Sequence, residues 1–215
     1  MDIVVQEGLE TLTITRLASS LDASVGSLYR YFEGKEALIV ALQEQAICGF
    51  RDQLMARLAL ADERAPDDMV AGVGTLYRLW VALTAYLEHA HSSPAHHRLI
   101  DTMMSAPEAV LDDAAARAVD DVVQAVLAIY GQLLQAAAQS GSLRPIEPQE
   151  LEVRTHLLWA AVHGLDHFRK RERIQAPHLH VEALTDHMMR SLLTGWGAPE
   201  PLIDAAYALA APIVE

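Results

Sequence analysis

Histidine is the residue type in this chain that most suggests metal chemistry, because four of the ten histidines fall in one short segment, EHAHSSPAHH, at residues 88–97. Neutral imidazoles at such spacing can bind Zn²⁺ or Ni²⁺. A second close pair follows at His178 and His180. No cysteine joins either group, and no carboxylate stands in a recognisable ligand pattern. These absences favour ordinary positions for these histidines, in loops or at helix ends, over a metal site. We therefore predict no metal and no other cofactor; the clustered residues are His89, His91, His96 and His97.

Redox and hydrolytic chemistry have less support in the sequence. Cys48 is the only cysteine, so an internal disulfide is impossible. Its neighbours Ala46, Ile47 and Phe50 are apolar, and an apolar helix favours an inert thiol over a reactive thiolate. The sequence has no nucleophile elbow, no HExxH motif and no convincing pair of catalytic acids. These observations predict that the protein is not an enzyme.

A different chemistry, contact with DNA, is open to the segment TITRLASSLDASVGSLYRYFEGKEAL, residues 13–38. Val25 could touch a thymine methyl group, Ser27 could bond a base or a phosphate, and Arg30 could reach a guanine edge. Gly26 has no side chain, so the backbone there could approach DNA closely, at a helix cost of ~1 kcal/mol. Phenol hydroxyls and a lysine at a helix start suit phosphate oxygens; these are Tyr29, Tyr31 and Lys35.

Helix signals show how this segment would be held. Thr13 is a good N-cap for a short helix whose apolar residues recur at helical spacing, at Ile14, Leu17, Ala18 and Leu21. A tight turn at residues 22–23 follows, and Ser24 can cap a second short helix over residues 25–32. A long helix then begins at Lys35 and extends to about residue 61. Two short helices joined by such a turn form a helix-turn-helix.

The rest of the chain also predicts helices. With 215 residues, 52% of them hydrophobic, it can bury a sizeable core, and alternating β-branched runs are nearly absent. We expect an all-α protein with further helices over residues 67–90, 94–105, 107–140, 148–173, 181–195 and 201–210, and a linker over 62–68. Polar residues interrupt the most apolar stretches before membrane-spanning length. With no signal peptide pattern, we expect no membrane segment and a cytoplasmic location.

Residues 13–38 resemble the DNA-binding region of the tetracycline-repressor (TetR) family of bacterial transcription regulators. The matching positions are Thr13, Leu17-Ala18, Ser24, Gly26, Leu28-Tyr29, Tyr31-Phe32 and Lys35-Glu36-Ala37-Leu38. The resemblance covers roughly residues 1–47 and implies a three-helix DNA-binding head there, followed at 48–215 by a helical effector-binding and dimerisation domain. It implies a dimeric regulator that reads a palindromic operator on double-stranded DNA, most often a repressor released by a small molecule.

The resemblance also implies functions for two sets of mostly apolar residues, a homodimer interface and an effector site. Stripes on the helices at 148–173 and 181–195 fit either a core or an interface by spacing alone, and the resemblance favours a homodimer interface at Leu158, Ala161, Val162, Leu165, Phe168, Leu184, Met188, Ser191 and Leu192. A second set predicts a site for a largely apolar effector, although each member taken singly fits a core: Tyr77, Trp80, Leu83, Tyr86, Met103, Met104, Tyr130, His156, Trp159 and His163.

This sequence departs from the family pattern in its head. The turn has Asp22 and Ala23 where the family has glycine and valine; aspartate tolerates left-handed geometry, so we expect the turn to form. The first helix has only residues 1–7, so either the start lies upstream or the head lacks its first turns. Residues 1–47 contain three bases and seven acids, a net charge of -4, which predicts modest, salt-sensitive DNA binding. Two alternatives stay open: an effector-binding protein with a non-functional head, and a histidine-based metal sensor.

Overall fold

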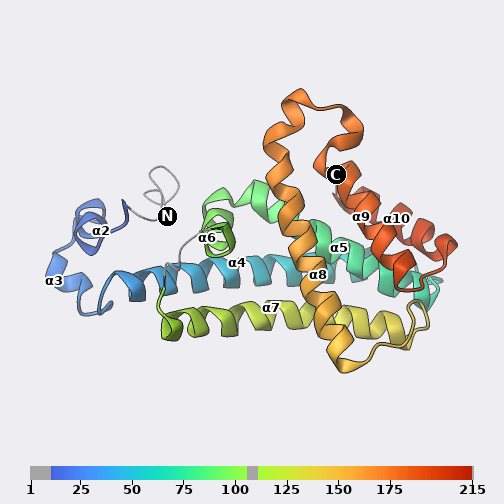
Figure 1. Ribbon diagram of the computed structural model, residues 1–215, viewed down its shortest axis with the longest axis horizontal. Coiled ribbons are helices and arrows are strands. Elements are labelled where there is room, and N and C mark those ends of the chain that lie inside the picture. Colours follow the sequence, from blue (N-terminus) through green and yellow to red (C-terminus); the bar gives the residue numbers. More distant parts are fainter. Residues whose placement is uncertain (1–10, 106–110, 215) are drawn as a thin grey trace. The chain divides into compact units, whose positions relative to one another are not determined.

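The computed structural model describes residues 11–105 and 111–214, with side chains over 11–102 and 111–211. Every regular element in this part of the chain is helical (Figure 1), which confirms the predicted all-α class. The α-helices are α2 (Ile14–Ser20), α3 (Val25–Leu28), α4 (Lys35–Arg64), α5 (Ala71–Ser92), α6 (Pro94–Ser105), α7 (Asp113–Gln139), α8 (Pro148–Asp166), α9 (Val181–Gly195) and α10 (Glu200–Val214). Two 3₁₀ helices, η2 (His167–Ile174) and η3 (Pro177–Leu179), connect α8 to α9.

The chain forms two compact units. The first combines Met1–Asp52 with His89–Val126, and the second combines Gln53–Glu88 with Leu127–Glu215. The boundary predicted between residues 47 and 48 lies inside α4, which continues unbroken through it. The division into a head and a larger domain at that residue stays a prediction.

The first unit is built on the helix-turn-helix pair α2 and α3, which pack against each other. Ile14 and Ala18 of α2 and Leu28 of α3 are buried, as the apolar spacing predicted, but Leu17 is half-buried and Leu21, expected on the same buried stripe, is 60% exposed because the helix ends at Ser20. The beginning of α4 adds buried Leu38 and Ile39. Burial of about 1.5–3 kcal/mol per large aliphatic side chain is what fixes such short helices, since neither is long enough to be stable alone.

The second unit has a core made by α5, the end of α4 and the C-terminal helices. Leu76, Leu83 and Leu134 are fully buried there, with Leu193 from α9. α9 returns beside α8 and contacts α10 (Figure 1). Arg190 of α9 forms an ion pair with Asp204 of α10, with its Nη1 2.5 Å from a carboxylate oxygen.

Predicted helix bounds are matched where local signals are strong and missed elsewhere. The bounds of α6 and α9 agree with prediction at both ends. The helix predicted over 148–173 ends as an α-helix at Asp166 and continues as η2. The second helix of the pair, predicted over 25–32, is an α-helix only to Leu28, after which the Arg30 and Tyr31 amides bond carbonyls three residues back.

Other differences lie at helix ends and in the predicted linker. α4 runs to Arg64, three residues into that linker, and Asp62 in its last turn forms an ion pair with Arg78 of α5. α5 begins at Ala71 instead of residue 67. The helix predicted over 107–140 is described from Asp113 to Gln139, and the one predicted over 201–210 extends over Glu200–Val214. The short first helix predicted within residues 1–7 lies outside the described residues.

α7 is the one described helix that is long and apolar enough to cross a membrane by length and composition. That test is also passed by core helices of soluble proteins, and Tyr130, Leu134 and Ala137 on α7 are buried. Burial of these residues accounts for part of the apolar composition of α7.

Candidate DNA-binding head and effector site

The two short helices of the head begin with the side-chain caps that the sequence predicted. Thr13 Oγ1 accepts from the Arg16 amide at 3.1 Å, and Ser24 Oγ accepts from the Ser27 amide at 3.1 Å. Each cap satisfies one of the amides that a helix start leaves without a partner, an interaction of about 1 kcal/mol. Thr13 and Ser24 are thus placed as caps, and both are exposed.

The turn between the helices forms as expected. Asp22 adopts a φ of +51°, the left-handed conformation that aspartate tolerates better than most residues. The Ala23 amide then bonds the Ala18 carbonyl at 2.9 Å, which closes the end of α2. The departure from the glycine and valine usual in the family therefore leaves the turn intact.

The residues predicted to contact DNA form a largely exposed surface. Tyr29 and Tyr31 are 55% and 77% exposed, although large aromatic side chains usually lie in cores. Arg30 is exposed too, and its Nη2 lies 3.4 Å from the Ser27 hydroxyl. A methyl group at Gly26 would contact nothing within 4 Å. No described residue gives a reason for glycine there; Lys35 is exposed, and Val25 and Ser27 are half-buried.

Several residues predicted to bind an effector are already occupied within the second unit. The Tyr77 hydroxyl donates to the Ala61 carbonyl at 3.2 Å, and the Tyr130 hydroxyl donates to the Ala82 carbonyl at 2.9 Å. Burial raises the pKa of both phenols, so both stay protonated donors. The Trp80 ring lies 5.1 Å from the Tyr207 ring. These three residues and Leu83 are buried, and they hold helices together in the core.

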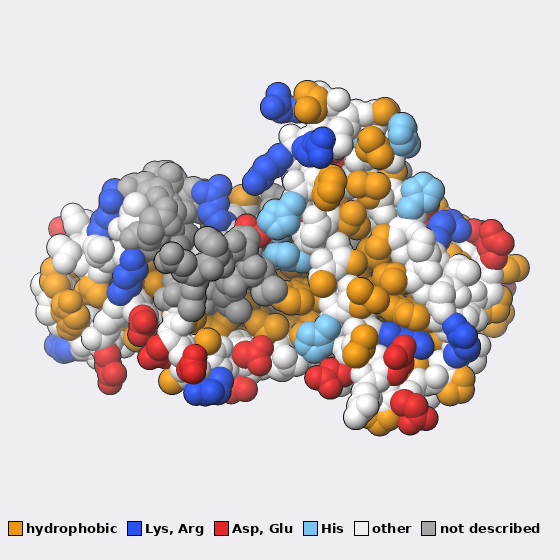
Figure 2. Space-filling model, viewed as in Figure 1, with side chains coloured by type: hydrophobic (Ala, Val, Ile, Leu, Met, Phe, Trp, Pro, Cys, Tyr) orange, Lys and Arg blue, Asp and Glu red, His pale blue; other side chains and the backbone are white. Residues whose placement is uncertain are grey.

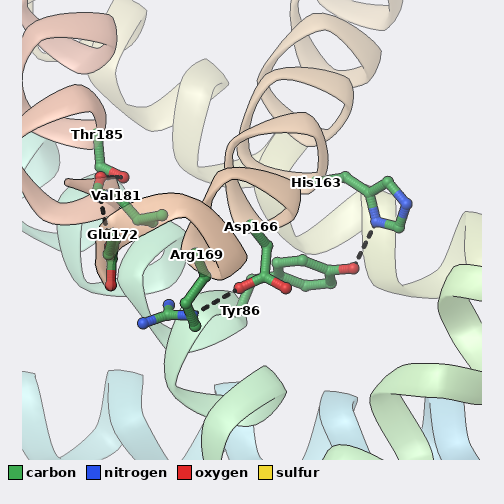
Figure 3. Close-up of polar contacts among 7 residues, drawn as sticks. All are labelled: Tyr86, His163, Asp166, Arg169, Glu172, Val181 and Thr185. Atoms are coloured by element: carbon green, nitrogen blue, oxygen red, sulfur yellow. Dashed lines mark hydrogen bonds and ion pairs between the residues drawn. The ribbon is translucent and has the colours of Figure 1, made fainter. Parts of the chain in front are cut away.

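A polar pair inside this apolar region has a different character. The Tyr86 hydroxyl of α5 lies 2.5 Å from His163 Nδ1 of α8, and both side chains are buried (Figure 3). The rings of Trp159 and His167 lie 5.7 Å and 5.5 Å from the His163 ring. A short hydrogen bond ringed by aromatic groups is the kind of polar feature that orients a ligand in an apolar site.

The remaining predicted effector residues are placed differently. His156 is half-buried, and its Nδ1 lies 2.8 Å from the Glu152 carbonyl one turn earlier. The side chains of Met103 and Met104 lie outside the described residues. Of the ten predicted residues, the structure therefore brings together Tyr86, Trp159 and His163 around a polar group.

Two of the clustered histidines, His89 and His96, pack within the first unit. His89 is buried, with its ring 5.3 Å from Phe50 and 6.0 Å from His96. Burial, with a further contribution from His96 and His97, lowers the pKa of His89 to about 4, so His89 is neutral at neutral pH. A Cβ at Gly49 of α4 would come within 3.1 Å of His96 Nδ1. His91 is exposed.

The predicted interface residues divide between buried and accessible positions. Leu158 and Val162 are each only 1% exposed within the single chain, so they belong to its core. Phe168 is exposed, and the others, Ser191 apart, are half-buried: Ala161, Leu165, Leu184, Met188 and Leu192. Ser191 is exposed, and its hydroxyl donates to the His187 carbonyl at 2.8 Å.

Two further apolar residues on α8 are strongly exposed: Val153, at 60%, was not among the residues predicted for an interface, and Leu157, at 46%, lies on the apolar stripe predicted for one. Val153 and Leu157 are four residues apart on one face of α8, and the exposed Phe168 follows on η2. The signal was present in the sequence, because α8 has apolar residues on two faces. Periodicity alone does not say which face the chain buries.

Family models match most of the chain. The model of bacterial regulatory proteins of the tetR family matches residues 1–42, and that of the tetracyclin repressor-like C-terminal domain matches residues 79–192. No curated protein sequence matches the chain at a significant level.

Solved structures are similar over nearly the whole length. The chain resembles a tetR-family regulatory protein from Rhodococcus RHA1 at 18% identity and a TM-score of 0.61, with 93% of both chains covered. It resembles FadR from Bacillus subtilis in complex with stearoyl-CoA at 12% identity and 0.64, covering 90% of this chain and 94% of that one. It resembles AibR in complex with isovaleryl coenzyme A and operator DNA at 15% identity and a TM-score of 0.59, covering 89% of this chain and 92% of that one. At these identities the similarity shows the fold.

Proposed function

Because the chain belongs to the TetR family of bacterial regulatory proteins, we propose that it is a ligand-responsive repressor. In this proposal a homodimer binds a palindromic operator in the cytoplasm and leaves it when a small, largely apolar effector binds. The family and the fold are those of transcription regulators and not of enzymes.

The observation that carries this proposal is the surface around Gly26. Open space above its Cα lets another backbone or a base edge approach, and the phenols of Tyr29 and Tyr31 extend beside it. Arg30 supplies a guanidinium that could bond a guanine in the major groove. Hydroxyls and amides carry no full charge, so this surface can hold phosphates even though residues 1–47 have a net charge of -4.

The exposed apolar residues on α8 and η2 support the proposed dimer. Val153, Leu157 and Phe168 would each place much of an apolar side chain in water in a single chain, and pairing these residues with their copies would remove that surface. The half-buried residues of α9 extend the same interface. Two heads related by a two-fold axis would then reach half-sites about one DNA turn, ~34 Å, apart.

α4 is the element that would carry an effector signal to the head. It is one helix from Lys35, at the head, to Arg64. Its last turns are tied to α5, which bears Tyr86, by three side-chain contacts: Arg57 Nε to Glu88 Oε2 at 2.6 Å, the Arg78–Asp62 ion pair, and the Tyr77 hydroxyl to the Ala61 carbonyl. A ligand that displaces α5 would therefore move α4 and change the separation of the heads, provided that it binds one arrangement more tightly.

The effector site is proposed at Tyr86, Trp159 and His163. A buried tyrosine–histidine pair can exchange its mutual hydrogen bond for one to a ligand carbonyl, while the ring of Trp159 contacts an apolar chain. FadR and AibR were solved with acyl-CoA molecules, so acyl thioesters are the first effectors to test. Stearoyl-CoA and isovaleryl-CoA bracket a wide range of acyl lengths.

The test is fluorescence anisotropy of the purified protein with labelled DNA from the region upstream of its gene, at low and moderate salt. We expect saturable binding by a dimer to a palindrome, weaker at moderate salt, and release on addition of an effector. A random-sequence DNA pool is the control for specificity. If the protein binds neither DNA at low salt, the proposed DNA-binding function is wrong.

A further inference from the structure

The segment that follows α8 is basic in an otherwise acidic protein. Residues 166–174 contain four bases and two acids, a net charge of +2, whereas the whole chain has a net charge of -13. The backbone remains right-handed helical at Asp166 and His167, so η2 extends α8 directly. Figure 2 shows Lys and Arg side chains gathered at the top of the view, over η2, with histidines beside and below them. Positive charge is thus concentrated at one end of α8.

Both acids in this segment already have partners (Figure 3). Asp166 accepts from Arg169 Nε at 3.1 Å, and Glu172 Oε1 accepts from the Val181 amide at 2.7 Å, which caps the start of α9. No carboxylate in the described part of the chain forms an ion pair with the three remaining bases, which are all exposed: Lys170, Arg171 and Arg173. Mutual repulsion among three neighbouring cations is relieved by a multivalent anion, and guanidinium groups bind phosphate with paired hydrogen bonds.

The position of these bases relates them to the proposed effector site. His167, at the start of η2, has its ring 5.5 Å from that of His163, which bonds Tyr86. From His163 to the three bases the helix axis advances about 10–20 Å, from the rise of the α and 3₁₀ forms. An effector with its apolar part at Tyr86 and Trp159 could therefore extend its other end along α8 to the bases.

We propose that Lys170, Arg171 and Arg173 form an anion-binding surface that holds the phosphate groups of the effector. The effector is then an amphipathic molecule: an apolar acyl part joined by a flexible arm to a phosphorylated head, which is the chemistry of a coenzyme A thioester. This inference rests on the proposed function for the acyl end of the site. The proposed phosphate contact rests on the three bases themselves, which are charged, exposed and without an ion pair to any described carboxylate.

The experiment compares two double variants by isothermal titration calorimetry. Arg171→Gln/Arg173→Gln removes two charges from the surface. Arg64→Gln/Arg117→Gln is the matched control, because both arginines are exposed and lie on other helices. The probes are stearoyl-CoA, stearate, S-stearoyl-pantetheine, which lacks phosphate, and coenzyme A alone.

We expect the test variant to bind stearoyl-CoA at least about tenfold more weakly than the wild type, since two charge-assisted contacts are lost. The control variant should match the wild type. Stearate and the pantetheine thioester should bind all three proteins equally. For the wild type, stearoyl-CoA affinity should fall with added salt more steeply than that of the test variant.

Several outcomes would overturn the inference: equal stearoyl-CoA affinity in the test variant and the wild type, or equal affinity of the wild type for thioesters with and without phosphate. Loss of the dimer or of operator binding in the test variant alone would also overturn it, by placing these arginines at a protein or DNA contact. If no acyl compound binds the wild type, the proposed effector class is wrong. Titration with coenzyme A alone then tests the anion-binding surface. If the wild type binds coenzyme A and the test variant does not, the surface is supported; if the wild type does not bind coenzyme A, the surface is ruled out.

Discussion

Gly26 offers a way to separate the stability of the head from its contact with DNA. It lies in the first turn of α3, and an added methyl group would meet nothing within 4 Å. Alanine is better than glycine in a helix by about 0.5–1 kcal/mol, mainly because it restricts the unfolded chain. Gly26→Ala should therefore raise the free energy of unfolding of the head by about that amount.

The same methyl group should weaken operator binding. If the backbone at Gly26 approaches DNA closely, the methyl group must displace a base edge or phosphate, and inserting one into a packed contact costs about 1–3 kcal/mol. That corresponds to about a 5- to 150-fold increase in Kd for each head. The variant would then be more stable and yet bind DNA less well, a combination that damage to the fold cannot produce.

Urea denaturation followed by circular dichroism measures the first effect, and fluorescence anisotropy with operator DNA measures the second. Gly195→Ala is the matched control, because Gly195 is also an exposed helical glycine with open space around it, but in α9. It should gain similar stability with unchanged DNA affinity. If Gly26→Ala binds operator as tightly as the wild type, the reasoning that puts this surface against DNA is refuted. Lower stability would refute the claim of open space.

Further substitutions test the other parts of the argument. Replacing both Tyr29 and Lys35 with alanine should reduce operator affinity, seen by anisotropy, without changing the dimer seen by light scattering; unchanged affinity would show that the head is misplaced. Leu157→Glu should convert the dimer to a monomer in light scattering, because the carboxylate would be desolvated in the interface, and a stable dimer would exclude this face. Tyr86→Phe should destabilise the protein to urea by about 1–3 kcal/mol, because a buried histidine nitrogen loses its partner, and should alter effector release of DNA; a neutral effect would mean that the pair is not formed. Because the folded-state pKa of His89, about 4, lies below its unfolded value near 6.5, its neutral form stabilises the fold above pH 6.5, and this contribution is lost as the pH falls toward 4. The stability difference between wild type and His89→Leu should thus shift against the wild type by as much as about 3 kcal/mol between pH 7 and 4, and a pH-independent difference would contradict the assigned burial.

Sequence alone determined the features that depend on neighbouring residues. The caps at Thr13 and Ser24 and the left-handed Asp22 each involve groups within a few residues of one another, so local chemistry is enough to predict them. The same holds for α6 and α9, whose ends are marked by Pro94 and Gly195. The resemblance of the head to the TetR family was visible in the sequence because the helix-turn-helix motif is a series of such local signals.

Tertiary structure decided what periodicity leaves open. α8 has two apolar faces, and only packing against α9 shows that Leu158 and Val162 are core while Val153 and Leu157 remain exposed. The sequence pattern predicted one helix through the change from α8 to η2, where Glu172 accepts from the first amide of α9, nine residues away.

The candidate effector site depends on the fold in the same way. Tyr86 and His163 are 77 residues apart, and their hydrogen bond exists only because α5 and α8 meet. The sequence could name both residues as candidates, but it gave equal weight to Tyr77 and Tyr130, whose hydroxyls bond main-chain carbonyls. Hydrophobic burial is not directional, so composition identifies the residues of a core, while the geometry of the packed helices selects the few polar groups left to face a ligand.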